Sequence, residues 1–130
     1  MIRQRALQIV LVLVGLLFSL AILPVIGGLR DPAGSDTGDT MQMAIYFALG
    51  ICLLVAVRKP AAHRSLITFA AWSSFAHAAV MSTLGFEIPA QRAGFLNGSA
   101  VLVVIGVLLI ALAPAKRSVA QPSASAKISA

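Results

Sequence analysis

His77 is the one histidine, acid or base that lies deep inside an apolar stretch of this 130-residue chain. Ser73 and Ser74 precede it by four and three positions, so the three side chains share one face of a helix. An ionisable group within a membrane is costly to bury and therefore marks a candidate functional site. Such a histidine could move protons, hydrogen-bond a ligand or bind a metal. A neutral histidine that only fixes helix packing is the more common alternative, and the sequence leaves both open.

Tyr46 lies at a similar depth in the preceding apolar stretch, on a helical face with Gln42 and Leu49. It is a candidate member of a polar site with His77. The alternative is an aromatic anchor at the outer membrane interface. Tyr46 points away from the small-residue face of its own helix, so we do not expect direct contact with His77.

Three methionines lie near the outer ends of two apolar stretches: Met41, Met43 and Met81. Thioethers beside a histidine suit copper(I), but methionine is also an ordinary filler of apolar gaps. The single cysteine, Cys52, can form no intramolecular disulfide and has no C-x-x-C partner. We therefore expect no metal and no cofactor.

Several classes of membrane enzyme and transporter lack the residues that they need here. A two-haem cytochrome requires several intramembrane histidines, and a thiol–quinone oxidoreductase requires paired cysteines. A small proton-coupled exporter requires a carboxylate within the membrane, yet all four acids lie outside the apolar stretches. No phosphate-binding loop or Ser-His-Asp arrangement is present. We expect no catalytic residue and no enzyme activity.

The composition predicts that these residues are positioned by membrane-spanning helices. Apolar residues make up 59% of the chain and charged residues 11%, against about 25% charged residues in soluble domains. The apolar residues fall in four stretches of the length that spans a bilayer. We predict an all-α, four-helix transmembrane domain over residues 1–114, followed by a disordered cytoplasmic tail over 115–130. The predicted helices cover residues 6–28, 41–57, 60–84 and 98–113.

Local signals place the ends of these helices. Asp39 and Gln42 have the spacing of a capping box and predict the start of the second helix. Pro60 suits the first turn of the third helix, because its missing N–H has no partner there. Pro114 ends the fourth helix.

The distribution of charge predicts the orientation. Eight of the ten basic residues lie before the first stretch, between the second and third, or after the fourth. The other two, Arg30 and Arg92, lie with all four acids. Basic residues collect on the cytoplasmic side, so we predict an up-down-up-down bundle with both termini in the cytoplasm. No basic stripe with interleaved aromatics indicates nucleic-acid binding.

Small residues recur every fourth position on two neighbouring helices, and such faces let membrane helices pack closely. One set is Ala44, Ala48, Cys52 and Ala56; the other is Ala70, Ser74, Ala78 and Ser82. We predict that the second and third helices pack through these faces as a tight antiparallel hairpin. We also expect Ala48→Leu or Ser74→Leu to destabilise the protein more than Leu49→Ala.

The run R-K-P-A-A-H-R-S-L-I-T-F-A-A-W-S-S-F-A-H-A-A-V-M, from Arg58 to Met81, is the most distinctive part of the chain. Together with A-I-Y-F-A-L-G-I-C-L-L-V-A-V, from Ala44 to Val57, it resembles a family of small bacterial four-helix membrane proteins of unknown function. The resemblance implies the four-helix fold and a location in the bacterial cytoplasmic (inner) membrane. It implies no activity.

These observations favour an accessory or interaction protein that contacts the lipid bilayer and forms a homo-oligomer or joins a larger membrane complex. The alternative is a small transporter or channel-like binding module that uses the polar face of the third helix. Its candidate residues are His77, Ser73, Ser74 and Tyr46.

Overall fold

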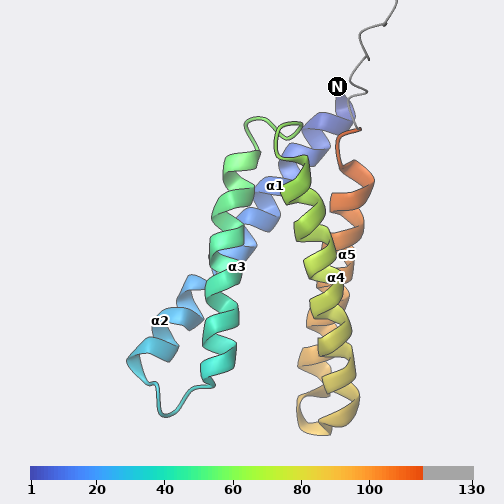
Figure 1. The fold of residues 1–130 in the computed structure, drawn as a ribbon. Helices are drawn as coiled ribbons and strands as arrows, with labels where there is room; N and C mark the ends of the chain where they lie inside the picture. Colours follow the sequence, from blue (N-terminus) through green and yellow to red (C-terminus); the bar gives the residue numbers. More distant parts are fainter. Residues whose placement is uncertain (116–130) are drawn as a thin grey trace, which may run out of the picture.

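The computed structural model describes residues 1–115, and within them every regular element is helical. The elements are α1 (Ile2–Ser19), α2 (Ile22–Arg30), α3 (Thr37–Ala56), α4 (Arg64–Glu87), the short 3₁₀ helix η1 (Pro89–Gln91) and α5 (Arg92–Leu112) (Figure 1). The prediction of an all-α fold is confirmed. The predicted disordered tail, apart from Ala115, lies outside the described residues.

Three helical stretches are long and apolar enough to cross a membrane: Ile2–Arg30, Thr37–Ala56 and Pro89–Leu112. Length and composition therefore support three of the four predicted membrane crossings. α4 has 24 residues and so has the length to span. It carries charged residues at both ends and a row of serine, threonine and histidine side chains between them, which makes it less apolar than the other three.

The first apolar stretch is bent rather than straight. α1 ends at Ser19, and α2 begins at Ile22. Pro24 has no N–H to donate to the carbonyl of Leu20, so the regular helical ladder cannot continue through this point. Tighter bonds replace it, with the Leu23 N–H donating to the Leu20 carbonyl at 3.0 Å.

α3, α4 and α5 begin at different residues from those expected, and α5 begins at Arg92 rather than at residue 98. Asp36, not Asp39, caps α3, and its carboxylate accepts from the Asp39 N–H at 3.1 Å. Both aspartates precede an apolar stretch, and the earlier one adds a further turn to the helix. α4 begins at Arg64 rather than at Pro60, because residues 60–63 form a turn in which the His63 N–H donates to the Pro60 carbonyl at 3.2 Å.

α1 and α3 form one closely packed pair that crosses at two glycines, Gly15 and Gly50. A Cβ atom added at Gly50 would lie 2.6 Å from the Ser19 backbone nitrogen and 2.8 Å from the Gly15 carbonyl oxygen. The two backbones therefore touch directly. Leu11 and Leu53 are fully buried in the surrounding core.

α4 and α5 form the second pair, and serines join them. The Ser99 hydroxyl of α5 donates to the Ala78 carbonyl of α4 at 2.9 Å. The Ser82 and Ser99 hydroxyl oxygens are 2.6 Å apart. Since the Ser99 hydrogen is already committed to Ala78, Ser82 is the donor to Ser99.

The prediction that the second and third helices pack on each other as a tight hairpin is wrong, because each has another helix as its main partner. α3 packs mainly on α1, and α4 packs mainly on α5. The small residues of α4 are largely buried, and Ala78 and Ser82 bond to Ser99 of α5. In the predicted face of α3 only Ala56 is buried, whereas Ala44, Ala48 and Cys52 are exposed. Glycine lacks a Cβ and allows a closer backbone approach than alanine, so the face of α3 that contains Gly50 is the one that packs.

Charge is divided between the two ends of the molecule. The N-terminus, the α3–α4 connection and the end of α5 lie together at one end, which we call the basic end (residues 1–5, 57–64 and 112–115) (Figure 1). The opposite end carries the α2–α3 connection and the turn between α4 and α5. All four acids of the sequence lie in these two segments or in the adjoining turns of α3 and α4.

Candidate functional site

The candidate residues Tyr46 and His77 meet across the seam between the two helix pairs. Their ring centroids are 5.2 Å apart, and the rings are inclined at 78°. Tyr46 also contacts Phe18 of α1, with centroids 4.9 Å apart and an inclination of 69°. Phe18, Tyr46 and His77 thus form a row of edge-to-face contacts, the aromatic row, that connects α1, α3 and α4.

The contact between Tyr46 and His77 was not expected from the sequence. The expectation assumed that Ala48 and Cys52 lie on the inward face of α3, which would turn Tyr46 away from α4. The inward face instead holds Tyr46, Gly50 and Leu53, and Tyr46 is only 8% exposed.

The candidate serines do not join His77 in a polar site. The Ser73 and Ser74 hydroxyls both donate to the Ala70 carbonyl, at 3.0 Å and 2.8 Å. Serine commonly satisfies its hydroxyl in this way inside a helix. Ser74 is completely buried. The predicted four-residue cluster is therefore divided: the serines bond within α4, and His77 contacts Tyr46.

The arrangement around His77 is suited to packing more than to metal chemistry. Within residues 1–115 no group of three or more His, Cys, Asp or Glu side chains is placed to hold a metal ion. The Met81 side chain lies against Gly98, where an added Cβ would be 2.6 Å from its Cε. Met81 thus fills a gap between α4 and α5, as a flexible thioether can.

Two polar side chains near the basic end have structural roles that sequence reasoning missed. Gln8 donates from its amide to the Val57 carbonyl at 3.0 Å and so joins α1 to the end of α3. Arg3 donates to the Ala111 and Ala113 carbonyls at 3.1 Å and 2.9 Å, which satisfies free carbonyls at the end of α5. The sequence did contain a signal for the first of these roles, because Gln8 is a polar residue inside the first apolar stretch.

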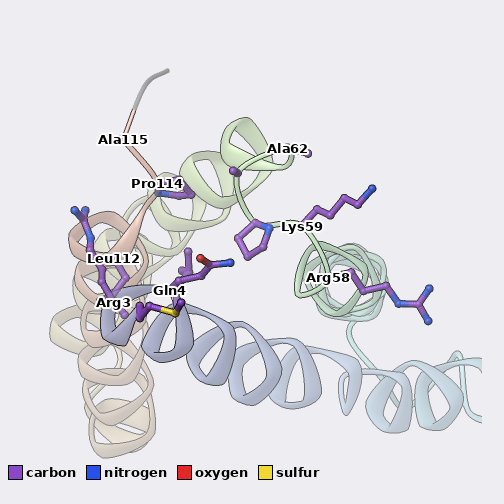
Figure 2. Close-up of a pocket in the computed structure, with 12 residues that line it drawn as sticks. Arg3, Gln4, Arg58, Lys59, Ala62, Leu112, Pro114 and Ala115 are labelled. Carbon is purple, nitrogen blue, oxygen red and sulfur yellow. The ribbon is translucent and has the colours of Figure 1, made fainter. Parts of the chain in front are cut away.

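A hollow of about 660 Å³ opens at the basic end, and we call it the basic hollow. α1, the α3–α4 connection and the end of α5 each supply part of its wall (Figure 2). The lining residues are Met1, Arg3, Gln4, Leu7, Arg58, Lys59, Pro60, Ala61, Ala62, Leu112, Pro114 and Ala115. Sequence reasoning did not single out this site, because its three segments are far apart along the chain.

The model of DUF6632, a family of unknown function, matches residues 1–129. The chain belongs to this family. The expectation that it is a member of an uncharacterised family is thereby confirmed. No curated protein and no solved structure matches this DUF6632 chain. Any function must therefore be argued from the residues themselves.

Proposed function

We propose that this DUF6632 protein is a four-pass protein of the bacterial inner membrane that acts by binding another membrane protein. The observation that carries the proposal is the uncovered small-residue face of α3, formed by Ala44, Ala48 and Cys52. The corresponding face of α4 is covered by α5. A face of small residues lets a second helix approach closely within a bilayer. We propose no catalytic role and no nucleic-acid partner.

The fourth crossing in this proposal is α4. Its 24 residues extend about 36 Å at ~1.5 Å per residue, which exceeds the roughly 30 Å of the hydrocarbon core. The hydroxyls of its Ser73 and Ser74 both donate to the Ala70 carbonyl, and such internal hydrogen bonds are what a lipid environment requires of polar groups. Four crossings put both chain ends on one side, and the basic end then faces the cytoplasm.

Reporter fusions test this orientation. A reporter inserted at Ser35 is expected outside the cytoplasm, and one at Ser125 inside it. If both reporters lie on the same side, the four-crossing arrangement is wrong.

A small transporter or channel-like module is less well supported. It would need a polar face on α4 that is open to water. Ser73 and Ser74 instead donate to Ala70, and His77 lies against Tyr46. A Ser73→Cys variant in a Cys52→Ser background should resist a water-soluble thiol reagent, and rapid labelling would favour the transporter.

Purification in a mild detergent tests the interaction role. Ala48 is exposed, so Ala48→Leu is expected to fold, and the destabilisation that the sequence predicted for it is not expected. Proteins or further copies of the chain that co-purify with the wild type should be lost from this variant, because a large side chain blocks the close approach of a second helix. Ala79→Leu is the matched control, an exposed alanine of α4 outside that face. Equal co-purification by both variants, or no companion in the wild type, would contradict the proposal.

A further inference from the structure

The basic hollow combines cationic side chains with apolar walls. Arg58 and Lys59 extend outward from one side, Arg3 stands on the opposite side, and Gln4 lies between them (Figure 2). The walls include Leu7, Pro60, Leu112 and Pro114. A site with a charged rim and apolar walls suits a ligand that has both an anionic and an apolar part.

The cations around this hollow have no acidic residue near them. All four acids of the sequence lie at the opposite end, in the connections there or in the adjoining helix turns, and Arg58 and Lys59 are exposed. Arg64, at the start of α4, does not line the hollow but lies at the same end of the molecule, and its buried Nη1 has no hydrogen-bond partner in the described part of the chain. A cation at a helix N-terminus is also disfavoured by the helix dipole. An external anion would reduce the mutual repulsion at this end.

We propose that the basic hollow binds the phosphate headgroup of an anionic phospholipid. The inference rests on the membrane placement proposed above, but not on the proposed protein partner. In that placement the hollow lies at the cytoplasmic interface, where anionic headgroups are concentrated and basic pockets between helices bind them. The long side chains of Arg58 and Lys59 can turn toward the phosphate, and the Gln4 amide can donate to it.

The outer surfaces of α1 and α5 supply the apolar part of the site. Ile9 is 60% exposed, and Ile110 is 42% exposed, each within a few residues of a hollow-lining leucine on its own helix. Acyl chains would lie along these surfaces while the phosphate occupies the hollow. A free phosphate ion would gain nothing from the apolar surface, so the geometry favours a lipid as the source of the anion.

The test compares lipid retention by three proteins in nanodiscs made of equal parts phosphatidylcholine and phosphatidylglycerol. Native mass spectrometry counts the phosphatidylglycerol that stays bound to the wild type, to Arg58→Gln/Lys59→Gln and to Arg5→Gln/Arg30→Gln. The last variant loses the same charge but alters no residue of the hollow. Each cation near an anionic surface contributes roughly 5-fold to affinity, so the hollow variant should bind on the order of 30-fold more weakly.

Selective loss of phosphatidylglycerol from the hollow variant, with retention by the control variant and a decrease at high salt, would support the proposal. Equal retention by both variants would overturn it. Competition by glycerol phosphate as effective as that by the lipid would also overturn it, because the headgroup alone would then suffice. A wild type that inserts but binds both lipids equally refutes only the lipid site, whereas failure to insert refutes the membrane placement as well.

Discussion

The two helix pairs of this protein are held together in different ways. α1 and α3 approach backbone to backbone at Gly50, where an added Cβ would lie 2.6 Å from the Ser19 nitrogen and 2.8 Å from the Gly15 carbonyl oxygen. The side chains of Leu54 and Ser19 also lie at this crossing. α4 and α5 meet through side chains, among them the hydroxyls of Ser82 and Ser99. The atoms nearest to Gly85, Gly98 and Gly106 of the second pair belong to side chains and not to backbone, as the Phe75 ring does at Gly106.

This difference predicts how each pair tolerates change. A backbone cannot move locally without displacing a whole helix, so the α1–α3 crossing has little room to adapt. A phenylalanine ring or a methionine chain can take another rotamer, so the α4–α5 contact can adjust. Substitutions of similar size should therefore cost more in the first pair than in the second.

The largest expected effect is that of Gly50→Ala. The new methyl group would meet backbone atoms of Ser19 and Gly15, so the free energy of unfolding should fall by about 1–3 kcal/mol. Gly94→Ala is the matched control, because an added Cβ there has no neighbour within 4 Å. Denaturation in mixed detergent micelles measures both. An equal loss of unfolding free energy in the two variants would show that the crossing at Gly50 is no more constrained than the open position at Gly94.

The aromatic row should come next, since its contact between Tyr46 and His77 joins the two pairs. Tyr46→Leu loses two edge-to-face contacts, each contributing about 0.5–1.5 kcal/mol. Tyr46→Phe keeps both rings and should retain nearly the full stability of the wild type. A loss in the phenylalanine variant as large as in the leucine variant would show that the hydroxyl, rather than the ring, matters.

Gly106→Ala tests the adaptability of the second pair directly. Its new methyl group would lie 2.6 Å from the Cε1 atom of Phe75. That ring is only partly buried and can turn, so the loss should be below about 1 kcal/mol and smaller than that of Gly50→Ala. The same micelle denaturation ranks the two variants. A loss greater than that of Gly50→Ala would reverse our comparison.

Ser82→Ala should have the smallest measurable effect. It removes one bond, from Ser82 to Ser99, and hydrogen bonds between membrane helices average about 0.6 kcal/mol. Ser99→Ala also removes the bond to the Ala78 carbonyl and should cost more than Ser82→Ala. Thermal unfolding of the two single variants decides this order, and a more stable Ser99→Ala protein would contradict it.

The helical class, the apolar stretches and the separation of charge could be predicted because each depends only on the order of residues along the chain. The choice of helix partners could not. α3 carries an alanine face and a glycine face, and only the three-dimensional packing selects the glycine face at Gly50. The start of α3 was similarly ambiguous, because Asp36 and Asp39 both suit an N-cap.

The residues of the candidate site could be predicted from the sequence, but most of the contacts between them could not. His77 and Tyr46 were singled out as intramembrane polar residues, yet their contact depends on the inward face of α3. Ser73 and Ser74 were grouped with His77 by spacing alone, and spacing does not reveal that both hydroxyls bond to Ala70. The basic hollow could not be predicted from the sequence, because it is formed by segments that are distant along the chain.

Oxidative cross-linking in native membranes tests the pairing of the helices most directly. In a Cys52→Ser background, Ser82→Cys with Ser99→Cys should form a disulfide between α4 and α5, because the two native hydroxyl oxygens are 2.6 Å apart. Ala48→Cys with Ser74→Cys should not, because Ala48 is exposed and Ser74 is buried. A disulfide in the second protein and none in the first would contradict the pairing described here and restore the hairpin predicted from the sequence.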